Sequence, residues 1–380
     1  YLYYLLILCL ICGSTLSCSR QPADKSVVRD MKYKQSLKEV YKRLGIFCTL
    51  NDVPGLSVAV SIDNKLVLAD GFGYSSKELK TKASPSNVYR IGQVSELITT
   101  LTAAKLAEQG KLSLDKPVKE LFPDLSTKPL NYTIYQLGTH VSGIRDQKKE
   151  AGKDDINTNE ALIPTFINDD LYFEPGTTVL HTELGIDLMG YLIQKSSNEP
   201  FLQMVKKTLC DNLKLSGTMP DNPYLIFENK SNQYNYDYIA QPSVAYPIDL
   251  RGKEASAGYL SSVLDMVKLG NALLYPGFLK EETLKMFNQP YTLTSGQKSP
   301  YGFGLIVNKD IQGHPFYGQK GMVSGGTATL LIYPEDKMVV AMAANIGKSS
   351  WELPVFDVAS VFQNQLHPDW AANANENQKK

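Results

Sequence analysis

Hydrophobic residues alternate with small or polar ones in two regions that lie far apart in the chain. Residues 56–62 are rich in β-branched side chains, and Asp63-Asn64 forms a turn into a second such stretch at residues 65–69. Residues 327–333 and 338–343 repeat this arrangement around a Pro-Glu-Asp turn. Both patterns predict a pair of antiparallel strands. We therefore expect one sheet that is assembled from both ends of the chain.

Apolar residues recur at helical spacing in several other stretches. This period is typical of amphipathic helices, and we expect helices at residues 31–50, 95–109, 184–195, 201–212 and 351–366. Residues 221–250 are rich in Tyr, Asn and Pro and predict an irregular segment over the mouth of a pocket. The order of the elements predicts an α/β (α+β) fold, in which helices flank an antiparallel sheet and a mostly helical subdomain is inserted.

One domain, residues 31–366, accounts for most of the chain. Polar residues before it predict a tether, and a tail rich in Asn, Ala, Glu and Lys is expected to fray. The predicted boundaries are residues 19–30 for the tether, 31–90 and 255–366 for the α/β part, 91–254 for the helical part and 367–380 for the flexible tail.

The first 18 residues are typical of a secretory signal. Residues 2–12 form an apolar run that is too short to span a bilayer alone, and small residues follow it. Residues 14–19 then resemble a degenerate lipobox in which Cys18 would be acylated, with Thr15 where Leu is usual. Because the chain starts at Tyr1, we expect an N-terminal Met to be missing. We predict an extracytoplasmic, membrane-anchored lipoprotein; the alternatives are a cleaved signal with secretion, an uncleaved anchor, or targeting to an organelle.

Composition excludes some classes of partner. The chain has 39 basic and 39 acidic residues, and the absence of a basic run argues against a nucleic-acid surface. Beyond the signal segment only Cys48 and Cys210 remain, too few for a disulfide framework. We expect both thiols to be buried and inert.

A series of short motifs follows in order between residues 53 and 345. Gly71-Phe72-Gly73-Tyr74 comes after the first strand pair, residues 137–145 read Leu-Gly-Thr-His-Val-Ser-Gly-Ile-Arg, and Tyr301-Gly302-Phe303-Gly304 comes near the end. Together they resemble the serine β-lactamase and penicillin-binding protein superfamily, in the branch that contains class C enzymes and a mitochondrial serine β-lactamase-like protein. The resemblance implies the β-lactamase/transpeptidase-like fold and a serine hydrolase ancestry.

The resemblance also marks positions at which the family's chemistry is replaced. In the family's Phe-Arg-Ile-Gly-Ser-Val-Ser-Lys segment, the first Ser is the nucleophile and the Lys activates it. Residues 89–97 read Tyr-Arg-Ile-Gly-Gln-Val-Ser-Glu-Leu, so Gln93 and Glu96 occupy those two positions. A Gln amide is not a usable nucleophile at neutral pH, and Glu reverses the charge. Ser95 is next to Glu96 in the sequence and therefore lies roughly 100° around the helix from it, away from the catalytic face.

The family's other two motifs are replaced as well. Its Tyr-x-Asn motif, expected after Glu-Pro-Gly-Thr, reads His181-Thr182-Glu183, and its Lys/His-Thr-Gly motif reads Gln319-Lys320-Gly321. Lys320 does not restore the missing cation, because neighbouring strand residues point to opposite faces. Two nearby residues have ordinary roles in this interpretation: Ser142 as a turn-forming hydroxyl, and His140 as a structural residue that bonds to backbone.

Three functions are compatible with these substitutions. We favour a pseudoenzyme that binds or scaffolds, with no cofactor and with a small molecule or peptide as its cleft ligand. The alternative is a rewired hydrolase of amide, ester or peptide bonds that uses His181, Glu183 and Glu96, with or without a metal. We expect these three side chains to converge on one pocket and prefer an internal His–Glu salt bridge over a metal site. The third function is self-association through the surface, as the mitochondrial relative is thought to do.

Overall fold

The computed structural model describes residues 24–146, 156–237, 239, 241–347 and 352–369. The predicted signal segment with Cys18 and nearly all of the predicted tail lie outside the described residues. In the described part of the chain, no helix has the length and apolar character needed to cross a membrane.

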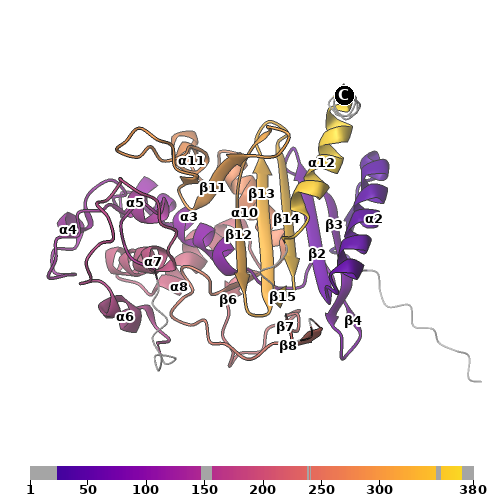
Figure 1. Cartoon of the computed structure of the whole chain (residues 1–380), viewed down its shortest axis with the longest axis horizontal. Coiled ribbons are helices and arrows are strands. Elements are labelled where there is room, and N and C mark those ends of the chain that lie inside the picture. The colour runs from indigo at the N-terminus through magenta and orange to yellow at the C-terminus, as the bar shows by residue number, and fades with distance from the viewer. Residues whose placement is uncertain (1–23, 147–155, 238, 240, 348–351, 370–380) are drawn as a thin grey trace, which may run out of the picture.

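A nine-stranded antiparallel sheet forms the centre of the α/β part (Figure 1). The strand order is β1-β3-β2-β14-β13-β12-β11-β10, with β4 paired on β3. The strands are β1 (Val28–Arg29), β2 (Gly55–Ile62), β3 (Lys65–Ser76), β4 (Thr81–Lys82), β10 (Tyr301–Gly302), β11 (Leu305–Lys309), β12 (Pro315–Val323), β13 (Gly326–Tyr333) and β14 (Met338–Ala344).

The two ends of the chain meet in this sheet, as predicted. Strand β2 pairs with β14, with Val58 opposite Met342 and Ala59 opposite Ala341. All residues of both strands are buried, so both faces of the sheet are covered. Val58 packs in a cluster with α2 (Lys34–Leu50) and α12 (Val355–Leu366), while Ala59 belongs to the cluster on the opposite face. The alternating pattern thus places larger side chains under the two terminal helices.

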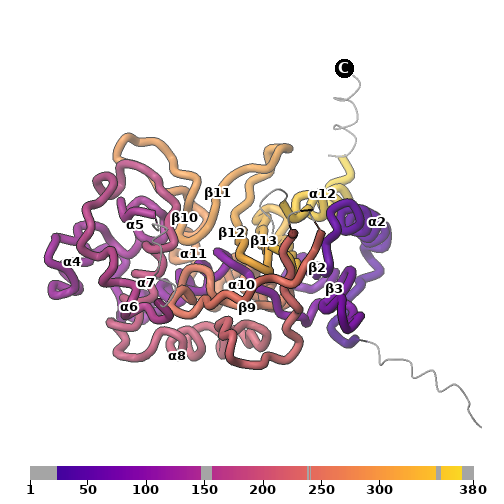
Figure 2. Tube along the Cα trace, turned by 60° about the horizontal axis from the view of Figure 1, so that its bottom comes forward, coloured from indigo at the N-terminus to yellow at the C-terminus, as the bar shows by residue number. Residues whose placement is uncertain are grey.

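The remaining helices gather on one side of the sheet, as two views of the chain show (Figures 1 and 2). They are α3 (Ser95–Glu108), α4 (Val118–Leu121), α5 (Ile134–Gly138), α6 (Asn159–Leu162), α7 (Glu183–Ser197), α8 (Phe201–Val205), α9 (Asp211–Leu213), α10 (Val263–Leu274) and α11 (Glu281–Asn288). Short 3₁₀ turns are η1 (Met31–Tyr33), η2 (Gly92–Val94) and η3 (Ile163–Thr165), and a π-helical turn, η4, spans Lys206–Cys210.

Two predicted helices differ from those in the structure. The helix predicted at 201–212 is α8, the π-helical turn and α9 in succession. The helix predicted at 351–366 begins at Val355, directly after Pro354, and Trp351 lies outside the described residues. The segment predicted to be irregular, 221–250, contains two short strands.

Two three-stranded sheets complete the fold. One has the order β5-β9-β6 and the other β15-β7-β8. Their strands are β5 (Tyr89–Arg90), β6 (Met219–Pro220), β7 (Tyr234–Tyr236), β8 (Pro242–Val244), β9 (Tyr259–Ser261) and β15 (Ile346–Gly347).

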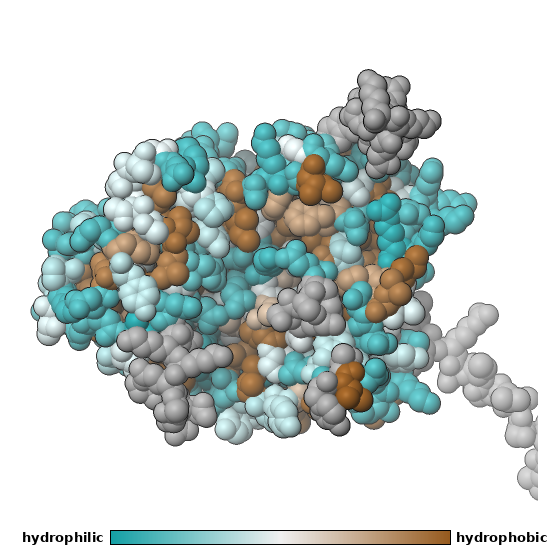
Figure 3. Space-filling view, viewed as in Figure 1, coloured by the Kyte–Doolittle hydropathy of each residue, from teal (hydrophilic) through white to brown (hydrophobic). Residues whose placement is uncertain are grey.

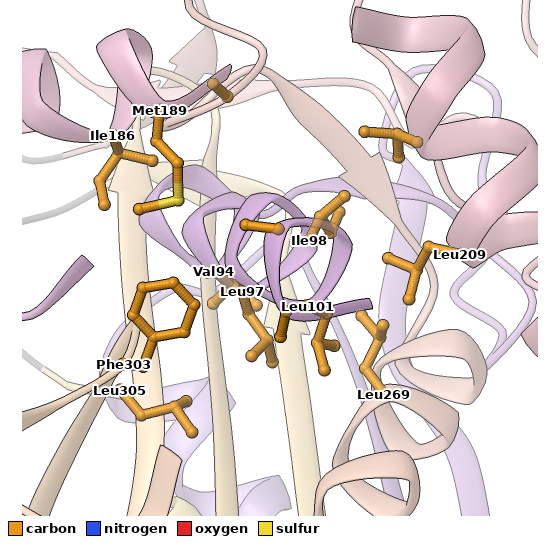
Figure 4. Packing of buried hydrophobic residues seen from close by; sticks show 14 of the residues in the cluster. Val94, Leu97, Ile98, Leu101, Ile186, Met189, Leu209, Leu269, Phe303 and Leu305 are labelled. Atoms are coloured by element: carbon orange, nitrogen blue, oxygen red, sulfur yellow. The ribbon is translucent and has the colours of Figure 1, made fainter. Parts of the chain in front are cut away.

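Helix α3 is buried on nearly all sides, where the helical part meets the sheet. Leu97, Ile98 and Leu101 of α3 are fully buried. Figure 4 shows Met189 of α7 and Phe303 among the side chains around the helix. Because such a helix is enclosed by protein rather than water, the position of its first turn is firmly fixed.

The outer surface offers no single apolar face in the view of Figure 3, where hydrophobic residues are scattered among polar ones. The two cysteines of the domain are half-buried rather than fully buried. Burial raises the pKa of Cys48 to about 12 and that of Cys210 to about 11. Both thiols are therefore protonated at neutral pH, which agrees with the predicted lack of reactivity.

Candidate functional site

The site forms where the turn η2 packs against strand β12. Gly92 has a φ of +51°, and a Cβ added to it would lie 2.6 Å from the backbone nitrogen of Met322. A Cβ on Gly321 would lie 2.1 Å from the carbonyl oxygen of Ile91. Only glycine allows the two backbones to approach this closely. Gly321, one of the predicted site positions, therefore acts by letting Gln93 lie beside β12.

The outer layer of the site is a chain of hydrogen bonds that runs through Gln93. Its Nε2 donates to Glu183 Oε1 at 2.7 Å, and its Oε1 accepts from the backbone N–H of Met322 at 2.9 Å. Glu183 Oε2 lies 3.4 Å from Lys253 Nζ. Both ends of the Gln93 carboxamide are therefore engaged within the protein.

The inner layer is centred on Glu96, which is fully buried. Its Oε2 accepts a hydrogen bond from Gln319 Nε2 at 3.0 Å and lies 3.3 Å from His140 Nε2. Its Oε1 lies 3.1 Å from His181 Nε2. The two imidazole rings face each other with centroids 4.3 Å apart, and Tyr301 lies at the edge of His140.

Burial and the neighbouring charges shift the pKa values of this layer in different directions. Burial opposes ionisation of Glu96, but His140 and His181 more than offset it and hold its pKa below the usual range. Burial also lowers the pKa of His181, yet the carboxylates of Glu96, Glu183 and Asp146 together raise it above the usual value. For fully buried His140, burial prevails and its pKa is lowered. Both histidines thus favour the ionised form of Glu96, and of the two it is His181 whose own pKa is raised.

The start of α7 explains why His181 and Glu183 diverge. Thr182 caps the helix: its Oγ1 accepts from the backbone N–H of Leu184 and donates to the carbonyl oxygen of Arg145. His181 precedes the cap and Glu183 is the first residue of the helix, so the two side chains leave the backbone in different directions.

The predicted convergence of Glu96, His181 and Glu183 is half right. Glu96 and His181 meet, whereas Glu183 bonds to Gln93 and Lys253 instead. His140 completes the inner cluster in its place, and its ring lies beside Glu96 instead of bonding to backbone as predicted. One feature of the sequence could have pointed to His140. Histidine is rare in this chain, which has only four, and two of them meet at this site.

Other predicted positions agree with the structure. Ser95 is buried and its Oγ accepts from the backbone N–H of Tyr259, away from Gln93. Ser142 Oγ accepts from the backbone N–H of Ile144 within its turn. Gln319 points inward to Glu96, while Lys320 points outward and pairs with Glu352.

Comparison with known proteins identifies the family. Residues 45–355 match the family model described as Beta-lactamase. The chain belongs to the beta-lactamase family. Among curated proteins, it is 26% identical over 379 residues to the human "Serine beta-lactamase-like protein LACTB, mitochondrial", covering 74% of this chain and 69% of that protein. It is 24% identical over 306 residues to "Protein flp" of Staphylococcus aureus strain MW2, covering 77% of this chain and 60% of flp.

Solved structures of family members share the fold. The octameric penicillin-binding protein homologue from Pyrococcus abyssi superposes with a TM-score of 0.74 at 25% identity, over 87% of this chain and 77% of that one. A D-amino acid amidase from Ochrobactrum anthropi SV3 gives a TM-score of 0.73 at 18% identity, over 88% of this chain and 99% of that one. The predicted β-lactamase/transpeptidase-like fold is confirmed.

Proposed function

We propose that this protein is a beta-lactamase-family member that does not form an acyl-enzyme and uses its cleft to bind a small molecule or peptide. The observation that carries this proposal is the engagement of Gln93. At the position of the family's nucleophile stands a carboxamide whose nitrogen and oxygen are both hydrogen-bonded within the protein. An amide nitrogen is a poor nucleophile because its lone pair is delocalised, and Glu96 cannot take the part of an activating amine.

The charge of the cleft suits a neutral or zwitterionic ligand. Glu96 and Glu183 alone would repel the carboxylate of a β-lactam or peptide. In the structure, however, His181 lies beside Glu96, and Lys253 lies beside Glu183. The two negative charges are therefore largely compensated, and the repulsion of a ligand carboxylate is weaker than the two glutamates alone would cause.

A second candidate function has one observation in its favour. The side chain of His181 is 34% exposed and lies beside the buried carboxylate of Glu96. An imidazole oriented by a carboxylate is the arrangement of a general base. Such a base would activate water for direct hydrolysis of an ester or amide, without a covalent intermediate. The amidase among the structural neighbours makes amides the first substrates to try.

The test is exposure of the purified protein to a fluorophosphonate probe and a fluorescent penicillin, with intact-mass analysis and an active class C β-lactamase in parallel. We expect no adduct. An adduct on any residue, including Ser95 or Ser142, would overturn the proposal. Turnover of amides or esters that disappears in His181→Ala, still without an adduct, would support the second candidate instead.

We also propose that the protein acts outside the cytoplasm on a lipid anchor at Cys18, as a binding partner that can self-associate. The support is the apolar run with its lipobox-like end, together with a relative that is described as octameric. Metabolic labelling with a fatty acid, lost in Cys18→Ser, tests the anchor. Size-exclusion chromatography at several concentrations tests association.

A further inference from the structure

We propose that Glu96, His140 and His181 bind one divalent transition-metal ion of the zinc class. The three side chains come from α3, from the segment after α5 and from the residue before the α7 cap. One donor atom from each lies within 4.8 Å of the others. This proposal does not depend on the loss of acyl transfer, since it concerns the groups behind Gln93.

The spacing of the donor atoms fits a single ion. Two donors bound to one tetrahedral zinc ion at about 2.0–2.2 Å lie about 3.3–3.5 Å apart. Glu96 Oε2 lies 3.3 Å from His140 Nε2, and Glu96 Oε1 lies 3.1 Å from His181 Nε2. Small rotations of the two rings would point both nitrogens at one centre. The ion pair between Glu96 and His181 is then the metal-free form of the site.

A second, independent observation comes from unmet hydrogen bonding. His140 is fully buried, yet neither of its ring nitrogens has a well-aligned hydrogen-bond partner among the described residues. Leaving such groups unpaired inside a protein is costly. A metal ion would satisfy a lone pair of the imidazole.

The surroundings supply the other features of a metal centre. Gln319 Nε2 donates to the second carboxylate oxygen of Glu96, and such outer hydrogen bonds orient ligands. His181 is the partly exposed member of the cluster, so a fourth position would be reached from its side. Two imidazoles and one carboxylate with an open position are the ligand set of catalytic zinc sites, in which the metal activates bound water.

The experiment is a titration of the chelator-treated full-length protein with Zn²⁺ and with Co²⁺, each metal alone. We expect one ion per chain by elemental analysis, a visible spectrum of tetrahedral Co²⁺ and a higher melting temperature. His181→Ala should weaken binding by more than about a hundred-fold, since loss of an outer hydrogen bond alone costs about 10–100-fold. Because His181 is partly exposed, this variant is expected to fold.

Two control variants separate this site from others. Glu352→Gln removes the charge of a surface carboxylate that pairs with Lys320, and His314→Ala removes an imidazole outside the cluster. Both should bind Zn²⁺ and Co²⁺ as the unmodified protein does. Gln319→Ala should weaken binding about ten-fold. Absence of stoichiometric binding, or equal binding by His181→Ala, would overturn the proposal.

Discussion

Arg90 and Glu96 are both buried and lie close together in the sequence. The two residues differ in how completely the groups around them are hydrogen-bonded. Arg90 and Asp221 are joined by a 2.5 Å contact, and each is at most 3% exposed. Arg90 also donates to the carbonyl oxygens of Ser324 and Ile248, and Lys230 donates to the free oxygen of Asp221. Around Glu96, by contrast, His140 has no well-aligned partner among the described residues.

This difference distinguishes a structural ion pair, Arg90–Asp221, from a candidate binding site, the cluster around Glu96. A buried charge with all of its hydrogen bonds made fixes the fold, because every alternative arrangement leaves a group unpaired. A buried cluster with unmet groups gains further stabilisation only when something binds. The Arg90 group therefore holds the strand before η2 in place, and the Glu96 group is the one that we propose binds a ligand.

The largest expected effect comes from breaking the satisfied pair. Arg90→Met leaves Asp221 buried with Lys230 as the one remaining cation that pairs with it among the described residues, and we expect a loss of about 3–5 kcal/mol in the free energy of unfolding. Urea denaturation at neutral pH measures it. Lys230→Met is the matched control and should cost less, because the Arg90–Asp221 contact remains. A loss below about 1 kcal/mol for Arg90→Met would remove the distinction between the two groups.

The same measurement on Glu96 should give a smaller value. In chelator-treated protein, Glu96→Gln keeps the side-chain shape but removes the charge, and we expect a loss of about 1–2 kcal/mol. The cost is limited because His181, the partner left behind, reaches solvent and can lose its proton, whereas Asp221 stays buried after Arg90→Met. An equal loss in Glu96→Gln and Arg90→Met would show that the Glu96 cluster is as structural as the other pair.

Substitution of Asp187 on α7 is expected to stabilise the protein, in contrast to the two substitutions above. It is fully buried, and no described group makes a well-aligned hydrogen bond to either carboxylate oxygen. Burial, and then the negative charge of Glu183, raise the pKa of Asp187 well above its usual value. The protonated form is thus favoured in the folded state relative to the unfolded chain.

The sign of the pH dependence follows from that shift. Because the folded state binds this proton more tightly, the contribution of Asp187 destabilises the protein increasingly as pH rises above about 4, the unfolded value. Asp187→Asn should therefore stabilise the protein by about 1 kcal/mol at pH 8, and the gain should vanish near pH 4. Urea titrations across this range test it, and a gain that is constant with pH would contradict the assignment.

Much of the scaffold could be predicted from the sequence, and part of the site could not. The strand pairs at 56–69 and 327–343 carry their alternation and turn residues locally, so β2, β3, β13 and β14 followed directly. The π-helical turn at Lys206–Cys210 has no local signature, because it arises from packing.

The site shows the same limit. Gln93 and Glu96 could be placed by their flanking motif, and Gln319 by strand alternation. His140 could not, since its motif predicted only a turn, and the direction of its side chain depends on how that turn packs behind α3. The prediction for Glu183 failed for a related reason. Glu183 is two residues from His181, but the helix cap lies between them, so this spacing does not predict the direction of its side chain.

The smallest expected effect lies on the same strand as the site. Gln319 is buried against Glu96, and its neighbour Lys320 pairs with Glu352 on the surface, with side chains 60% and 67% exposed. Exposed pairs of this kind contribute little, because water screens the charges and the long side chains lose freedom. We expect Lys320→Ala to change the free energy of unfolding by less than about 0.5 kcal/mol and to leave Zn²⁺ binding unchanged. A larger effect on either quantity would mean that the outward face of β12 also takes part in the site. In that case, the alternation of side chains along this strand would not separate the residues of the site from those that face solvent.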